Sequence, residues 1–233
     1  GFKVDAEQVV ISSGTEYLFY IIFKLFNNKI YGLENPCHKM FKELFLTNNI
    51  SFKAISLDEN GIVIDDLKKH NVNIAYVTPS HQFPTGAIMS ISRRTELLNW
   101  ANENLDRYIV EDDYDSEFKY TGRPIPALKA NDINDKVIYL GSFSKSISPA
   151  IRVSYLVLPK ALLNIYQREL PYFICPVPTL NQKILYRFIK DGYFVKHINK
   201  MRTLYKKKRE FLVNTIKAYS SKILNKEIQI QGA

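Results

Sequence analysis

The chain has 233 residues, 46% of them hydrophobic and 24% charged, so it has the composition of a globular protein and the length to bury a full-sized core. Its 9 Gly, 10 Pro and 13% aromatic residues exclude low-complexity, collagen-like and disordered chains. The net charge of +9 leaves two interpretations open: a nucleic-acid-binding protein, or a protein with an anionic ligand and a lysine-rich surface.

Neither a membrane span nor a secretory signal is predicted. The longest nearly apolar run, residues 17–23, is too short to cross a bilayer, and charged residues interrupt the start of the chain. The two cysteines, Cys37 and Cys175, are too few for a disulfide framework and have no metal-ligand spacing. These features predict a protein of the reducing cytoplasm.

The predicted elements alternate between strand and helix. Short apolar runs predict strands at residues 8–12, 29–33, 51–56, 73–77, 108–110, 137–140 and 153–158. Apolar residues at helical spacing predict helices at 14–26, 37–46, 64–70 and 90–104. This order indicates an α/β fold in three layers, with a mostly parallel sheet flanked by helices. In such sheets, ligands bind beyond the carboxyl ends of the strands.

Beyond about residue 184 the pattern changes. Residues 192–219 predict one long, strongly basic helix, and the next strand is expected at 228–230. The chain ends just after that strand and does not begin with Met. We therefore expect a piece of a longer protein, cut at both ends.

The first candidate site is the strand-to-helix turn Ser12-Ser13-Gly14-Thr15-Glu16. Small residues at the start of a helix expose backbone N–H groups at the positive end of the helix dipole, which suits an anion or a phosphate. The alternative is an ordinary helix start, with Ser13 as the N-cap.

The second candidate is the acidic run from Glu111 to Asp115, which directly follows a predicted strand. Clustered carboxylates repel one another, so a cation would stabilise them. That cation could be a metal ion or a charged group on a cofactor. An acidic, solvated loop is the third interpretation.

The third candidate combines Gly141-Ser142-Phe143-Ser144-Lys145 with Arg152, again after a predicted strand. A lysine at the edge of a buried strand is expected to be partly desolvated, which lowers its pKa and frees the amine as a nucleophile. Ser142, Ser144 and Arg152 offer phosphate-binding donors. The alternative is an ordinary surface lysine.

The three candidates combine into one cofactor site. All lie at carboxyl ends of predicted strands, and together they offer an anion site, a carboxylate, an amine and an arginine. Pyridoxal 5′-phosphate needs this set, because it uses a Lys Schiff base, an acidic partner for its ring nitrogen and a phosphate site.

Six segments, in order along nearly the whole chain, carry a family resemblance. They are VISSGT (10–15), TPSHQFPTG (78–86), EDDYDSEF (111–118), YLGSFSK (139–145), SPAIR (148–152) and the helix 192–209. The sequence resembles the fold type I aminotransferase family of pyridoxal-phosphate enzymes, and within it the aminotransferase-like domain of the MocR-type GntR transcriptional regulators.

The resemblance implies roles for individual residues. Lys145 would form the Schiff base, Asp112 would pair with the ring nitrogen and Tyr114 would hydrogen-bond the ring oxygen. The phosphate would be held by Gly14, Thr15, Ser142, Ser144 and Arg152, with Glu16 contributing only its backbone N–H.

The sequence departs from the usual family pattern at two positions. Where related proteins place an aromatic ring to stack on the cofactor, this chain has His38, whose imidazole can stack. Where many aminotransferases have Asn before Pro-Thr-Gly, it has Phe83, so Tyr114 or Gln82 would have to contact the ring oxygen.

The resemblance further implies a domain organisation and a function. Residues 1–190 would form the cofactor-binding large domain, and 191–233 the connecting helix with the first strand of a truncated C-terminal subdomain. The domain would sense or transaminate an amino compound within a GntR/MocR-type regulator, or belong to a free-standing aminotransferase acting on amino acids. A homodimer is expected at full length, with DNA bound through a domain outside this chain. A third possibility is a nucleic-acid-binding module that uses the basic helix, although its spaced apolar residues favour a packed helix with one solvated face.

Overall fold

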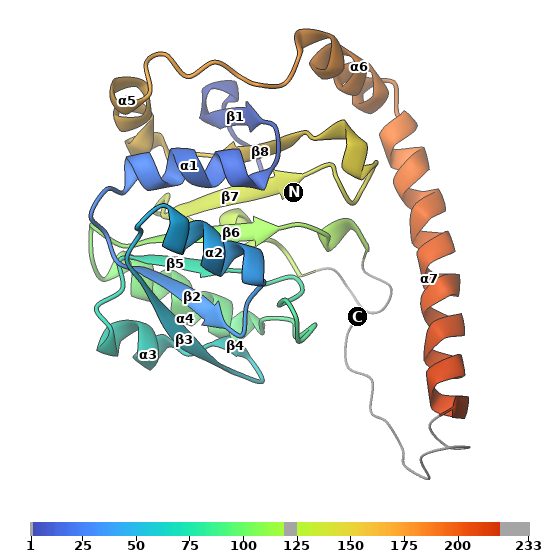
Figure 1. Ribbon diagram of the computed structural model, residues 1–233, viewed down its shortest axis with the longest axis horizontal. Helices are drawn as coiled ribbons and strands as arrows, with labels where there is room; N and C mark the ends of the chain where they lie inside the picture. Colours follow the sequence, from blue (N-terminus) through green and yellow to red (C-terminus); the bar gives the residue numbers. More distant parts are fainter. Residues whose placement is uncertain (1, 119–124, 220–233) are drawn as a thin grey trace.

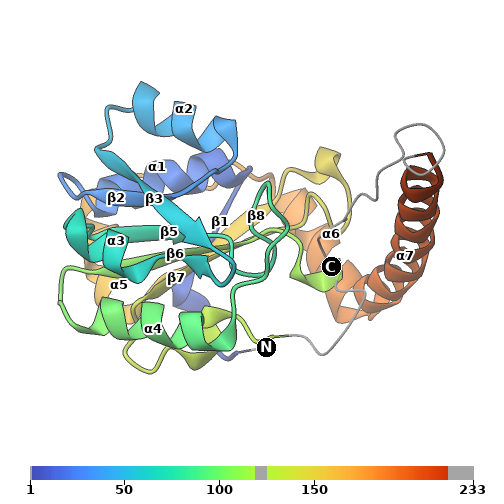
Figure 2. The ribbon, with the colours of Figure 1, turned by 90° about the horizontal axis from the view of Figure 1, so that it is seen from below.

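The structure, a computed structural model, describes residues 2–118 and 125–219. Within these residues, an eight-stranded sheet lies at the centre, in the strand order β1-β8-β7-β6-β5-β2-β3-β4. Helices pack on both of its faces (Figures 1 and 2). The predicted three-layer α/β fold is confirmed.

Most strands of the sheet run parallel. The parallel set consists of β2 (Tyr31–Asn35), β3 (Phe52–Asp58), β5 (Ile74–Val77), β6 (Tyr108–Asp113) and β7 (Val137–Ser142). β8 (Ser154–Val157) runs antiparallel to both β7 and β1 (Val9–Ser12), and β4 (Gly61–Ile62) runs antiparallel to β3. β1 therefore points the same way as the parallel set, so the chain leaves β1, β2, β5, β6 and β7 at one edge of the sheet.

The two faces of the sheet carry different helices. On one face lie α1 (Thr15–Leu25), α2 (Lys39–Thr47) and α5 (Lys160–Glu169), whose apolar side chains form one core with the sheet. On the other lie α3 (Ile64–Lys69) and α4 (Ile91–Asn102), around the fully buried Trp100. Each helix folds where its apolar residues recur at helical spacing, because only then can one stripe be buried against the sheet.

The remaining elements are short turns and two C-terminal helices. The 3-10 turns are η1 (Ala6–Gln8), η2 (Ser116–Phe118), η3 (Leu128–Asn131) and η4 (Pro149–Ile151). Helices α6 (Thr179–Lys190) and α7 (Tyr193–Tyr219) follow, and α7 stands beside the sheet rather than on it (Figure 1). No helix of the described residues is long and apolar enough to cross a membrane.

Three expectations about the elements need correction. β6 continues to Asp113, so the first three acidic residues lie inside the strand and not in a loop after it. α7 has the predicted length, but Ile198 is its single buried residue, and Leu204 and Phe211 are exposed. The packed-helix prediction is therefore confirmed in part within the described residues: Met201 and Tyr205 are half-buried, whereas Leu204, Phe211 and Leu212 are exposed. β4, α5 and α6 were not predicted, and the strand expected at 228–230 lies outside the described residues.

Candidate functional site

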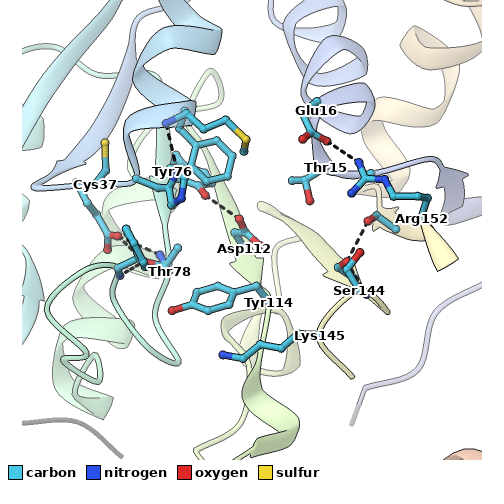
Figure 3. A pocket seen from close by; sticks show the side chains of 18 residues that line it. Thr15, Glu16, Cys37, Tyr76, Thr78, Asp112, Tyr114, Ser144, Lys145 and Arg152 are labelled. Carbon is cyan, nitrogen blue, oxygen red and sulfur yellow. Dashed lines mark hydrogen bonds and ion pairs between the residues drawn. The ribbon is translucent and has the colours of Figure 1, made fainter. Parts of the chain in front are cut away.

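A cavity of about 350 Å³ opens at the edge of the sheet where the parallel strands end (Figure 3). It is lined by ten of the eleven predicted site residues, namely Gly14, Thr15, Glu16, His38, Asp112, Tyr114, Ser142, Ser144, Lys145 and Arg152. Gln82 is not among the lining residues. The expectation that ligands bind beyond the carboxyl ends of the strands therefore identified residues that are more than 130 positions apart in the sequence and line one cavity.

One wall of the cavity is suited to an anion. The N-cap of α1 is Gly14, not Ser13, and within the part of the chain that the structure describes no side-chain hydrogen bond caps the first turn. Arg152 lies beside the start of α1, with its Nη2 3.4 Å from Glu16 Oε2 (Figure 3). Ser142 Oγ accepts a hydrogen bond from the Ser144 N–H at 3.2 Å. A guanidinium, hydroxyl groups and a helix N-terminus converge here, which is the donor set of a phosphate site.

The opposite wall holds a buried carboxylate, Asp112. Tyr76 Oη donates a hydrogen bond to Asp112 Oδ2 at 2.7 Å. Burial raises the pKa of Asp112; the hydrogen bond from Tyr76 opposes this, but the charges of Asp113 and Asp115 raise it further, and the pKa reaches about 7. A cationic N–H group beside this carboxylate would favour its ionised form.

The other acidic residues of β6 point away from the cavity. Glu111 is fully buried and accepts hydrogen bonds from the backbone N–H groups of Leu128 and Lys129. Asp113 accepts from Ser116 and from Tyr139. The interpretation as an acidic, solvated loop is therefore wrong. In the part of the chain that the structure describes, no cluster of three or more His, Cys, Asp or Glu side chains could hold a metal ion.

Lys145 follows β7 and reaches the floor of the cavity beside Tyr114, whose ring centroid lies 5.1 Å from Nζ (Figure 3). The Lys145 side chain is 50% exposed and forms an ion pair with Asp115. The predicted desolvation of Lys145 is therefore not found, because the end of β7 is open to solvent. Tyr114 Oη donates a hydrogen bond to the His81 carbonyl at 2.7 Å.

His38 and Gln82 have different positions relative to the cavity. His38 lines it, its ring centroid lies 4.7 Å from that of Phe83, and its Nδ1 accepts the Met40 N–H at the start of α2. Gln82 is buried, and its Nε2 donates to the carbonyls of Pro36 and Phe83. These bonds hold the side chain in the loop. Gln82 therefore does not reach the cavity, contrary to the prediction.

Eight lining residues were not among the predicted site residues, and two of them, Glu34 and Tyr76, bear on the acid chemistry of the cavity. Glu34, at the end of β2, is buried; its Oε2 accepts the Thr78 hydroxyl at 2.6 Å, and its Oε1 has no hydrogen-bond partner among the described residues. Burial raises the pKa of Glu34 to about 7, against the hydrogen bonds from Thr78 and Gln82. Tyr76 lies on β5 and fixes Asp112. Glu34 would have been found at a strand end had the strand predicted at 29–33 been extended to Asn35, whereas Tyr76 already lay in the strand predicted at 73–77.

Comparisons with known proteins agree with this geometry. The sequence model of the aminotransferase class I and II family matches residues 1–231. The uncharacterized HTH-type transcriptional regulator YdeL of Bacillus subtilis is 40% identical over 100% of this chain and 49% of its own length. The probable rhizopine catabolism regulatory protein MocR of Rhizobium meliloti is 31% identical over 91% of this chain and 43% of its own length.

A solved structure shares the fold. The multiple substrate aminotransferase from Thermococcus profundus superposes with a TM-score of 0.80 at 30% identity, over 91% of this chain and 55% of that one. The chain thus spans about half the length of the relatives it matches. The resemblance to the aminotransferase-like domains of MocR-type regulators is confirmed. The chain belongs to the class I and II aminotransferase family, whose cofactor is pyridoxal 5′-phosphate.

Proposed function

We propose that this domain binds pyridoxal phosphate through Lys145 and senses or transaminates an amino compound, as the effector domain of a GntR/MocR-type transcriptional regulator. One observation carries the proposal: an amine, a buried carboxylate and an anion site line the same cavity. The similarity to YdeL and MocR supports the regulatory context.

The anion wall fits the phosphate group. Gly14 has φ +94°, which favours glycine, and a Cβ atom there would lie 2.2 Å from Arg152 Nη2, so a side chain at this position would push the guanidinium away from the helix N-terminus. Thr15, Ser142 and Ser144 add hydroxyl donors around the same space. The Glu16 carboxylate, now beside Arg152, would have to turn away, because it would repel a phosphate.

The opposite wall fits the pyridine ring. Asp112 would pair with the ring nitrogen, whose N–H would give a cationic partner to a carboxyl whose pKa burial raises to about 7. Tyr114 would contact the ring oxygen and His38 would stack on the ring, since both line the cavity.

When bound, pyridoxal phosphate supplies an aldehyde that bonds an amine and a ring that withdraws electrons from the substrate's α-carbon. Lys145 would provide the amine for the resting protein. When it is not bonded to the cofactor, Lys145 Nζ would lie in the cavity as the group that holds the proton from the substrate's α-carbon. Arg152 and the start of α1 would keep the cofactor in place while Lys145 is free.

A free-standing aminotransferase is the second candidate. It is supported by the aromatic-amino-acid aminotransferase 1 of Thermococcus litoralis, which is 30% identical over 93% of this chain. The regulators share a higher identity of up to 40%, which favours the effector-domain proposal. In that proposal residues 1–190 form the cofactor-binding domain and 191–233 begin a second unit. The full-length protein is a homodimer, and its helix-turn-helix domain contacts DNA.

A spectral titration of the intact protein tests the proposed function. Adding pyridoxal phosphate is expected to give a yellow protein, and a panel of amino compounds is then expected to include one that changes the absorption spectrum. If the cofactor binds and no amino compound changes the spectrum, the sensing and transamination roles are both wrong. Conversion of the amino compound into its keto product at catalytic rates would favour the aminotransferase.

A further inference from the structure

Glu34 is a buried carboxyl group that lines the cavity and has no role in the proposed function. It lies on β2, and it is 2% exposed. Its oxygen Oε2 accepts three hydrogen bonds from the loop after β5: from the Thr78 hydroxyl at 2.6 Å, from the Thr78 N–H at 3.2 Å and from Gln82 Nε2 at 3.4 Å. Its other oxygen, Oε1, is also buried and has no hydrogen-bond partner among the described residues. The two oxygens of one carboxyl group therefore have different environments.

This difference assigns the proton of a neutral Glu34 to Oε1. A neutral carboxyl group has one acceptor oxygen and one hydroxyl, and the oxygen that receives three donors is the acceptor. Burial raises the pKa of Glu34, the hydrogen bonds from Thr78 and Gln82 oppose this, the charge of Asp112 adds to it, and the pKa reaches about 7. Below that pH, Oε1 carries a buried hydroxyl donor, which is costly unless a ligand supplies an acceptor.

The cations of the cavity are engaged with other carboxylates. Lys145 forms an ion pair with Asp115, and Arg152 forms one with Glu16. Acidic groups interact electrostatically with Glu34, namely Asp112, Cys37, Tyr76 and Tyr114. A carboxyl group with acidic neighbours is stabilised in its neutral form. The surroundings therefore favour a proton on Glu34 rather than a charge.

The ring oxygen of the cofactor would lack a hydrogen-bond donor from the two residues expected to contact it. Gln82 donates to two carbonyls of its own surroundings and does not line the cavity. Tyr114 donates its single hydroxyl proton to the His81 carbonyl at 2.7 Å. Burial raises the pKa of Tyr114, and nearby charges, that of Glu34 included, raise it further, so Glu34 lies close to this hydroxyl. Glu34 thus adjoins the residue assigned to the ring oxygen.

We propose that Glu34 is a cofactor-binding residue whose Oε1 hydroxyl donates a hydrogen bond to the ring oxygen of pyridoxal phosphate, while its Oε2 holds the loop after β5. The inference rests on the proposed function, because it requires the cofactor in this cavity. A bond to the ring oxygen gives Oε1 the partner that it lacks, and it leaves the three bonds of Oε2 unchanged. One side chain then positions both the ring and the loop.

Infrared spectroscopy of the cofactor-free protein tests the first step, the proton on Glu34. At about pH 6, below the pKa of about 7, wild type is expected to show a protonated-carboxyl band that Glu34→Gln lacks. Glu103→Gln is the matched control: it removes an exposed carboxylate that pairs with Lys68 and Arg107, and it leaves the band unchanged. A difference spectrum of Glu34→Gln without this band overturns the inference, whether or not the protein binds pyridoxal phosphate.

Titrations of the intact protein with two cofactors test the second step, the bond to the ring oxygen. The probes are pyridoxal phosphate and its analogue without the ring hydroxyl. Glu34→Leu is expected to weaken binding of pyridoxal phosphate at least about tenfold and binding of the analogue much less. Glu34→Gln is expected to keep most of the affinity, because its amide oxygen replaces Oε2 and its N–H replaces the Oε1 hydroxyl. Thr78→Val, which removes one bond to Oε2, is the matched control and affects both cofactors equally.

Two results of these titrations overturn the inference. Equal losses for the two cofactors in Glu34→Leu would show that Glu34 only supports the loop. A loss in Glu34→Gln as large as that in Glu34→Leu would show that an ionised carboxylate is required, and Glu34→Gln gives this answer against wild type even where Glu34→Leu does not fold. If neither cofactor binds the wild type although the infrared band is present, the proposed function fails and the inference falls with it. If the band is absent, the inference alone fails.

Discussion

At the scale of single residues, the anion wall depends on the missing side chain of Gly14. An alanine there would meet Arg152 Nη2 at 2.2 Å and Glu16 Oε2 at 2.7 Å. Gly14→Ala is expected to displace Arg152 and weaken pyridoxal phosphate binding at least about tenfold, since a hydrogen bond to a charged group contributes roughly 1.5–3 kcal/mol. Absorbance titration with the cofactor measures the change.

Gly192 provides the matched control. It too has a positive φ, +78°, but no atom of residues 2–118 and 125–219 lies within 4 Å of the position of a Cβ atom. Gly192→Ala is expected to lose about 1–2 kcal/mol of unfolding free energy from backbone strain and to keep its cofactor affinity. Equal cofactor affinities for the two variants would show that Gly14 does not shape the anion wall.

Asp112 predicts a dependence of stability on pH. Its pKa is about 7 in the folded chain against an ordinary value of 3.8, so between these values the folded state binds more protons than the unfolded state. The contribution of Asp112 to the free energy of unfolding therefore falls as the pH rises from about 4 to about 7. Asp112→Asn removes this contribution and is expected to exceed the cofactor-free wild type by roughly 1–3 kcal/mol at pH 8.

Urea unfolding at a series of pH values checks this prediction. The two proteins should converge towards pH 4, where the Asp112 carboxyl is protonated in the folded chain. Asp106→Asn, which changes a carboxylate with a 65% exposed side chain, should follow the wild-type curve. A constant difference between Asp112→Asn and wild type across the pH range would contradict the assignment of a buried, neutral carboxyl.

Which residues lie at the cavity could be predicted from the sequence, but their contacts could not. Lys145, Asp112 and Arg152 were found because each stands next to a strand end, and strand ends follow from apolar patterning. Gln82 was placed wrongly at the cavity, and Asp115 was not predicted as the ion-pair partner of Lys145. Both errors arise because the direction of a side chain in a loop depends on the loop's tertiary contacts. Gln82 turns to the Pro36 carbonyl, which lies 46 residues earlier in the chain.

At the scale of elements, the alternation of β6 separates its three neighbouring acidic residues. Successive side chains of a strand point to opposite faces, so Asp112 faces the cavity while Glu111 and Asp113 face the other side. Predicting the strand to end at Val110 hid this separation and suggested one acidic cluster. Strand ends that carry charge are hard to place from sequence, because hydrophobic patterning stops where buried polar residues begin.

Helix α7 is anchored to the rest of the chain near η2. The rings of Phe118 and Tyr205 meet edge to face with centroids 5.2 Å apart, and Arg202 donates to the Glu117 carbonyl. Tyr205→Ala is expected to raise amide hydrogen exchange in α7 roughly two- to tenfold, since an aromatic pair contributes roughly 0.5–1.5 kcal/mol. Mass spectrometry of α7 peptides measures the rates.

The neighbouring Leu204 is the control for this prediction, because its side chain is exposed. Leu204→Ala should leave exchange in α7 close to the wild-type rate. If both variants exchange alike, the contact with Phe118 does not hold the helix.

At the scale of the whole molecule, most of the net positive charge lies on a different element from the one that forms the cofactor cavity. Helix α7 carries eight Lys or Arg residues against one Glu, so it accounts for +7 of the net charge of +9. The cofactor cavity lies at the strand ends and uses only Lys145 and Arg152 as cations. The positive charge of the composition therefore describes α7 rather than the site. The sheet order and the cavity carry the functional proposal.

The assignment of Lys145 as the residue that bonds the cofactor is tested most directly by mapping. The protein is incubated with pyridoxal phosphate, reduced with borohydride, digested and analysed by mass spectrometry. We expect the phosphopyridoxyl group on Lys145, and its loss in Lys145→Ala. Modification of a different lysine in the wild type, or the same adduct in Lys145→Ala, would contradict the assignment.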